Sequence, residues 1–129
     1  MHILLVGKTS SITTTIQTML RSIDDWSTQL HSDLNDFTKI SQEKSDFDLL
    51  IANLEDFRRS STKVISQIRD HFDVTPLLVV HSYHYSALIE PLITAGATGY
   101  IQNDMSDSKL IKAVQKVASG TKCIIAEST

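Results

Sequence analysis

The chain has 129 residues, of which 41% are hydrophobic and two are proline. This length supports one hydrophobic core and is too short for two ordinary domains. The formal net charge of -3 provides no overall attraction to nucleic acid or to an anionic membrane, so we expect no DNA contact by this segment alone.

Cysteine content and hydropathy narrow the class of protein further. Cys123 is the single cysteine, so an internal disulfide is excluded, and no compact Cys/His spacing predicts a zinc site. The longest apolar runs are far too short to span a bilayer, and the N-terminal run MHILLV lacks the basic flank and cleavage site of a signal peptide. We therefore expect a cytoplasmic protein.

Strand-like apolar runs alternate with helical patterns along the whole chain, which is typical of a parallel sheet covered by helices on both faces. The first half predicts, in order, a strand at residues 3–6, a helix that begins near Ser10 or Ser11, a strand at 26–30, a short polar helix marked by Leu34, Phe37 and Ile40, and a strand at 47–54. Residues 49–52 are continuously apolar, so this last strand should lie in the middle of the sheet.

The second half repeats the pattern. It predicts a helix marked by Val64, Ile65, Ile68 and Phe72, a strand at 76–80, a helix around 89–93, a strand at 98–102, and a helix that Ser106 caps and Gly120 ends. Proline lacks an N–H and clashes with the preceding turn, so the helix containing Pro91 either begins near Glu90 or is bent at the proline. We expect Cys123 to be buried beside the last helix, residues 1–126 to form one domain, and residues 127–129 to begin a linker or tail.

Several local strings resemble the receiver domain of two-component response regulators, especially receivers that precede a LuxR-type helix-turn-helix. The resemblance rests on LLV at 4–6, DLLIANL at 48–54, PLLVV at 76–80 and AGATGY at 95–100. It covers nearly the whole chain. It implies an α/β, doubly wound (βα)5 flavodoxin-like fold, a three-layer sandwich with a five-stranded parallel sheet in the order 2-1-3-4-5.

The residues at the receiver active site depart from the family pattern. In typical receivers two acidic residues after the first strand bind Mg²⁺ with the phosphoacceptor aspartate, while a Thr or Ser and a Lys hold the phosphoryl oxygens. The matching residues here are Gly7, Lys8, Asn53, His81 and Asn103. An asparagine amide is a poor nucleophile and a weak ligand for a hard cation. The resemblance therefore implies a receiver without Mg²⁺-dependent phosphotransfer, with no catalytic residue, bound metal or cofactor, and no enzymatic activity.

The loop lysine after the first strand has two interpretations. The ammonium of Lys8 could occupy the space of the metal ion, where it would hydrogen bond Asn53 or pair with Glu55 or Asp56. Alternatively, Lys8 is a solvated loop residue, since exposed ion pairs typically contribute only about 0 to 1 kcal/mol.

Two aromatic residues, His81 and Tyr100, stand at the positions that the resemblance matches to the family's conformational switch. His81 takes the place of the small hydroxyl residue, and a histidine at a strand end is more often a hydrogen-bonded structural residue than a ligand or base. Tyr100 matches the switch aromatic and is either fixed inward or outward, or packed against the fourth helix. Tyr83, His84 and Tyr85 follow His81 and could form an exposed partner-binding surface.

The leading interpretation is a pseudo-receiver, a regulatory and dimerisation domain whose output is independent of aspartyl phosphorylation. The resemblance implies a homodimer through the fourth helix, fifth strand and fifth helix, and a histidine kinase or other signalling protein as partner. It also implies regulation of transcription through a DNA-binding domain beyond Thr129. The alternative is a stand-alone ligand-sensing or protein-docking module that uses the altered pocket around Gly7, Asn53, His81 and Asn103.

Overall fold

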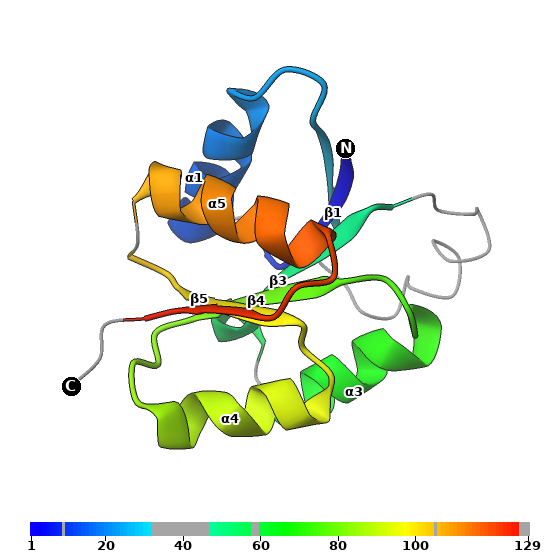
Figure 1. Ribbon diagram of the computed structural model, residues 1–129, viewed down its shortest axis with the longest axis vertical. Helices are drawn as coiled ribbons and strands as arrows, with labels where there is room; N and C mark the ends of the chain where they lie inside the picture. Colours follow the sequence, from blue (N-terminus) through cyan, green and yellow to red (C-terminus); the bar gives the residue numbers. More distant parts are fainter. Residues whose placement is uncertain (9, 32–46, 58–59, 105, 127–129) are drawn as a thin grey trace.

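The protein is a three-layer α/β sandwich with one parallel sheet as its middle layer (Figure 1). The computed structural model describes residues 1–8, 10–31, 47–57, 60–104 and 106–126. Within these residues, no helix combines the length and the apolar character that crossing a membrane requires. The helix predicted from Leu34, Phe37 and Ile40 lies outside the described residues.

Strands and helices alternate along the chain as the sequence predicts. The elements are β1 (His2–Val6), α1 (Ser11–Arg21), β2 (Ser27–His31), β3 (Leu49–Asn53), the 3-10 helix η2 (Leu54–Asp56), α3 (Ser61–His71), β4 (Leu77–His81), α4 (Ser86–Ala95), β5 (Gly99–Gln102), α5 (Asp107–Ala118) and β6 (Cys123–Ile125).

The sheet order is β2-β1-β3-β4-β5-β6, and neighbouring strands pair in parallel. This confirms the predicted order 2-1-3-4-5 and adds a sixth strand that we did not predict. Cys123 is buried as expected, but it lies in β6, opposite Gly99 of β5. Three residues are too few for a recognisable strand pattern, so pairing with β5 is what makes this segment a strand.

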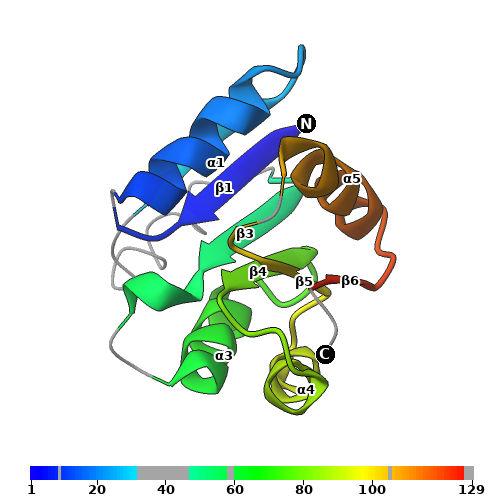
Figure 2. The same cartoon turned by 90° about the vertical axis from the view of Figure 1, so that its left-hand side faces the viewer.

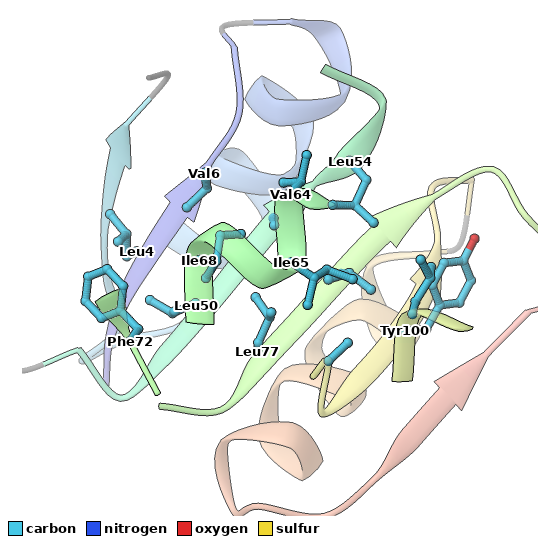
Figure 3. Packing of buried hydrophobic residues seen from close by; sticks show 14 of the residues in the cluster. Leu4, Val6, Leu50, Leu54, Val64, Ile65, Ile68, Phe72, Leu77 and Tyr100 are labelled. Carbon is cyan, nitrogen blue, oxygen red and sulfur yellow. The ribbon is translucent and has the colours of Figure 1, made fainter. Parts of the chain in front are cut away.

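The helices cover the sheet in pairs, with α1 and α5 on one face and α3 and α4 on the other (Figure 2). Successive side chains of a strand point to opposite faces, so each strand serves two cores. From β3, Leu50 and Ala52 join the core under α3 and α4 (Figure 3). Leu49 and Ile51 join the core under α1 and α5. Burying each large apolar side chain contributes about 1.5 to 3 kcal/mol, which holds the carboxyl ends of the strands in register.

The predicted capping signals are found at the start of α1 and at the end of α5, whereas Ser106 precedes α5 without a capping hydrogen bond from its side chain. The Ser10 hydroxyl accepts a hydrogen bond from the Thr13 N–H, so Ser10 is the N-cap of α1. At the end of α5, Gly120 has a φ of 87° and its N–H donates to the Val117 carbonyl, while the Thr121 N–H donates to the Lys116 carbonyl. These bonds form a Schellman motif, which turns the chain toward β6.

The helix α4 begins before Glu90, which decides against one of the two alternatives for the helix that contains Pro91. It starts at Ser86 and continues through Pro91, so a start near Glu90 is wrong. Proline removes the hydrogen bond to the carbonyl four residues earlier, which belongs to Ala87. Pro91 and Ala87 are both exposed, so water can satisfy that carbonyl and the helix tolerates the proline.

Arg69 of α3 joins the ends of two helices. Its guanidinium donates to the Gly96 carbonyl over 2.7 and 2.9 Å, to the Phe72 carbonyl over 2.9 Å and to the Thr75 carbonyl over 2.5 Å. Burial lowers the pKa of Arg69, and the nearby Asp73 carboxylate opposes this. The sequence offered no signal for this role, because the carbonyl groups that Arg69 binds become neighbours only in the folded chain.

Candidate functional site

The residues singled out from the sequence lie together at the carboxyl ends of the central strands. Gly7 follows β1, Asn53 ends β3, His81 ends β4 and Asn103 follows β5. The strands are parallel and adjacent, so their carboxyl ends lie side by side. In open parallel sheets, binding sites usually lie at the carboxyl ends of the strands.

Asn53 is fully buried at this edge. Its amide nitrogen lies 3.5 Å from the Thr13 hydroxyl, which is a long and weak hydrogen bond. Its buried Oδ1 accepts no hydrogen bond from any residue in the described part of the chain. A buried carbonyl oxygen without a donor costs about 1 to 3 kcal/mol, so the pocket around Asn53 is incompletely satisfied.

The first turn of α1 supplies the side chain that Asn53 contacts. Thr13 is fully buried, and its hydroxyl accepts a hydrogen bond from the Ser10 hydroxyl over 3.0 Å. Ser10 thus both caps α1 and positions Thr13 next to Asn53. The sequence analysis missed this contact. The three-residue spacing of Ser10 and Thr13 indicates a helix cap, but it does not indicate that β3 ends beside the cap.

Lys8 is exposed beyond the end of β1. The predicted hydrogen bond from Lys8 to the Asn53 carbonyl is wrong, because that oxygen has no donor among the described residues. The side chain of Asp56, one of the alternative partners, lies outside the described part of the chain.

Asn103, which follows β5, contacts an acidic residue that follows β3. Its amide nitrogen donates a hydrogen bond to the Glu55 carboxylate, which η2 places just after Asn53. Asn103 is therefore a neutral donor that holds the Glu55 carboxylate. The sequence analysis considered Glu55 only as a partner of Lys8.

His81 and Tyr83 form a stacked pair at the end of β4. Their ring centroids lie 3.9 Å apart with an interplanar angle of 15°. The His81 Nδ1 accepts a hydrogen bond from the Ser82 N–H over 2.8 Å, which requires that this nitrogen be unprotonated. Burial lowers the pKa of His81, and the Glu55 carboxylate opposes this. These contacts favour a neutral, structural histidine.

Tyr100 points inward from β5 and is fully buried (Figure 3). It packs in the core that includes Ile89 and Leu92 of α4. Its hydroxyl donates to the Tyr83 carbonyl over 2.7 Å, and burial raises its pKa. Tyr83 therefore contacts both His81 and Tyr100.

The donor set at this edge does not fit a magnesium ion. Gly7 has no side chain, Lys8 carries a positive charge and Asn53 is neutral, whereas Mg²⁺ prefers one or two carboxylates. Across the described residues, no three His, Cys, Asp or Glu side chains gather closely enough to hold a metal ion.

The fold is shared with known proteins although the sequence is not. No family model matches the chain, and a search of curated proteins finds no match. A LuxR-family two-component response regulator from Aurantimonas sp. SI85-9A1 is similar with a TM-score of 0.80 and 16% identity, over 95% of this chain and 87% of the other. A LuxR-family DNA-binding response regulator from Silicibacter pomeroyi gives 0.78 and 14%, over 95% and 96%.

The receiver domain of the sensor histidine kinase PA1611 from Pseudomonas aeruginosa PAO1 is also similar. Its TM-score is 0.74 at 20% identity, over 92% of this chain and 97% of the other, and it has a magnesium ion coordinated in its active-site cleft. At these identities the likeness is one of fold. The chain has the doubly wound, flavodoxin-like receiver fold of two-component response regulators.

Proposed function

We propose that this chain is a non-enzymatic receiver-like domain of a response regulator, whose output does not depend on Mg²⁺-dependent aspartyl phosphorylation. One observation carries the proposal. Asn53, the residue that the resemblance to receivers matches to the phosphoacceptor, is fully buried at the end of β3, and positions 7 and 8 carry no carboxylate. A neutral amide cannot act as the nucleophile, and these neighbours cannot hold the metal ion that the reaction needs.

Contacts within the chain then replace the phosphoryl group in setting the conformation. In phosphorylated receivers the switch aromatic turns inward when the hydroxyl residue moves toward the phosphoryl group. Here Tyr100 is already inward, held by its bond to the Tyr83 carbonyl, and Tyr83 stacks on His81. These contacts support a domain that holds one signalling conformation without phosphorylation.

Phosphoryl uptake tests the proposal directly. The protein is incubated with Mg²⁺ and acetyl phosphate and then analysed by intact mass spectrometry, with a receiver that carries the aspartate as positive control. We expect no stable phosphoryl adduct on this chain, and none on the Asn53→Asp variant, because Gly7 and Lys8 still provide no metal ligands. A stable adduct on the natural chain would refute the proposal. Labelling of the variant would show that the rest of the pocket is competent.

We further propose that the domain forms a homodimer through α4, β5 and α5, and that it receives its signal from a histidine kinase or another signalling protein. The residues of β5 are all buried and β6 pairs with β5, so β6 would add to this surface beside β5. Ile124 lies opposite Tyr100 and therefore points to the α4 side of the sheet. The side chain of Ile124 in β6 is 39% exposed, and that of Leu88 in α4 is 47% exposed. Apolar side chains of an interface would be exposed in this way in a monomer.

Dimerisation is measurable by sedimentation velocity over a concentration series. We expect the natural chain to sediment as a dimer at high concentration, and Leu88→Glu to sediment as a monomer because a carboxylate would be buried at the contact. The exposed Val74, which lies away from this surface, provides the control Val74→Glu. A monomer at all concentrations would contradict the dimer.

Regulation of transcription would require DNA binding outside this domain, since the chain has a net charge of -3. Two structurally similar proteins are LuxR-family regulators, and one of them is a DNA-binding response regulator. We propose that a C-terminal DNA-binding domain, as the sequence resemblance implies, would supply this contact.

A further inference from the structure

A cavity of about 130 Å³ lies beside the candidate site, on the face of the sheet that α1 and α5 cover. Its wall is formed by apolar side chains from four elements, including Ile16 of α1, Val80 of β4, Ile101 of β5 and Leu110 of α5. The cavity therefore lies where the first turns of α1 and α5 meet the carboxyl ends of the central strands.

The cavity is open to solvent on one side, because Ser11 and Thr15 of its lining are exposed. The residues around it are otherwise tightly packed, since Ile16, Val80, Ile101 and Leu110 are all buried. A mostly apolar hollow with a few polar groups in its wall is the usual form of a small-molecule site, so this cavity is a candidate ligand site.

The lining defines the chemistry of that occupant. Among the described residues, none that lines the cavity is charged, which favours a neutral molecule. Gln102, which is only 7% exposed, and Asn103 add amide side chains to the lining, and an amide group can hydrogen bond a hydroxyl, carbonyl or amide. An engineered cavity of about 150 Å³ lined by aliphatic side chains binds benzene, so this volume suits a single ring.

The surroundings of the cavity favour a small molecule over a protein partner. A protein that inserted a side chain here would also cover an apolar rim around the opening. Within the described residues, the large apolar side chains that are exposed belong to Val74, Tyr85, Leu88 and Ile124, and none of these lines the cavity.

We infer that this cavity binds a small neutral molecule that has one ring and one hydrogen-bonding group, and that this binding is an input to the domain. The occupant would touch Asn103, which holds Glu55, and Gln102, which lies opposite His81 in the sheet. From His81 the contacts continue through Tyr83 to Tyr100. The inference adds an input to the proposed function and does not depend on it, because ligand binding and phosphoryl uptake are measured separately.

Methyl NMR of the whole chain tests the inference. The probes are benzamide, benzyl alcohol and cyclohexanecarboxamide, which are neutral, and benzoate, which has the shape of benzamide but is charged. We expect at least one neutral probe to cause saturable shifts of the Ile16, Ile101 and Leu110 methyl signals, and benzoate at the same concentration to cause none.

A matched pair of variants locates the binding. Thr15 lines the cavity and is exposed, whereas Thr18 is exposed one turn further along α1 and does not line the cavity. Both hydroxyls donate to a carbonyl four residues earlier, so replacing either by Phe removes the same kind of bond. We expect Thr15→Phe to abolish the shifts, because its ring fills the cavity, and Thr18→Phe to preserve them. The inference is overturned if no neutral probe causes saturable shifts in the natural chain, if benzoate binds equally well, or if Thr15→Phe binds like Thr18→Phe.

Discussion

Replacing Asn53 by Asp should make the stability of the protein depend on pH. The new carboxyl group would be fully buried, with the Thr13 hydroxyl as its nearest partner. Burial of this kind disfavours the charged form and raises the pKa of a carboxyl group by about 3 units or more above its unfolded value near 3.9.

The size and sign of the effect follow from proton linkage. Below about pH 4 the carboxyl group stays protonated in both the folded and the unfolded state, so the substitution lowers the free energy of unfolding only a little. As the pH rises the unfolded state loses its proton first, and the folded state becomes less stable by about 1.4 kcal/mol per pH unit. A shift of about 3 units gives a loss of about 4 kcal/mol at pH 7, against a total stability that is typically about 5 to 15 kcal/mol.

Urea unfolding from pH 4 to pH 8 measures this loss, with Asn53→Leu as the control. Leu is similar in size, removes the same weak bond to Thr13 and cannot ionise, so its difference from the natural chain should not change with pH. Equal stability of Asn53→Asp and Asn53→Leu at pH 8 would refute the reasoning. It would mean that the carboxylate is solvated or paired with a cation at this edge.

Two further predictions concern residues that the structure assigns to packing. Arg69→Ala should lower the free energy of unfolding by about 3 kcal/mol or more, because it leaves several carbonyls without their charged donor. Thermal unfolding measures this loss, and the control Lys63→Ala, which changes an exposed residue on the same helix, should show little change. His81→Gln should make the protein less sensitive to acid. The lowered pKa of His81 means that the unfolded state binds the proton more readily, so the natural chain loses stability as the pH falls below about 6.5, and a variant with an unchanged acid profile would contradict this.

The strand at residues 47–54 illustrates what could be read from the sequence. Its continuous apolar run placed it in mid-sheet, and the structure has β3 between β1 and β4. The following strand and helix were located by similar local patterns, since apolar spacing reflects which faces are covered. The positions that depart from the receiver pattern were equally accessible, because they follow directly from residue identity at the strand ends.

Contacts between distant segments were not accessible in the same way. The strand β6 exists through its pairing with β5, and the orientation of Tyr100 depends on a carbonyl of the loop that carries Tyr83. One of the two alternatives for α4, a start near Glu90, was wrong because Pro91 signals a local disruption, whereas its exposure to solvent lets the helix continue through it.

The alternation of apolar runs and helical spacing in the sequence indicated an α/β fold with a parallel sheet, because periodicity is a local property of the chain, and the resemblance to receivers implied the order of the strands and the departures around Asn53. Tertiary structure alone decided that Asn53 lies against Thr13 with its carbonyl oxygen unpaired, that Arg69 joins α3 to α4, and that a cavity remains beside Asn103. Each of these depends on the distance between atoms far apart in sequence, which is set by how the helices pack on the sheet.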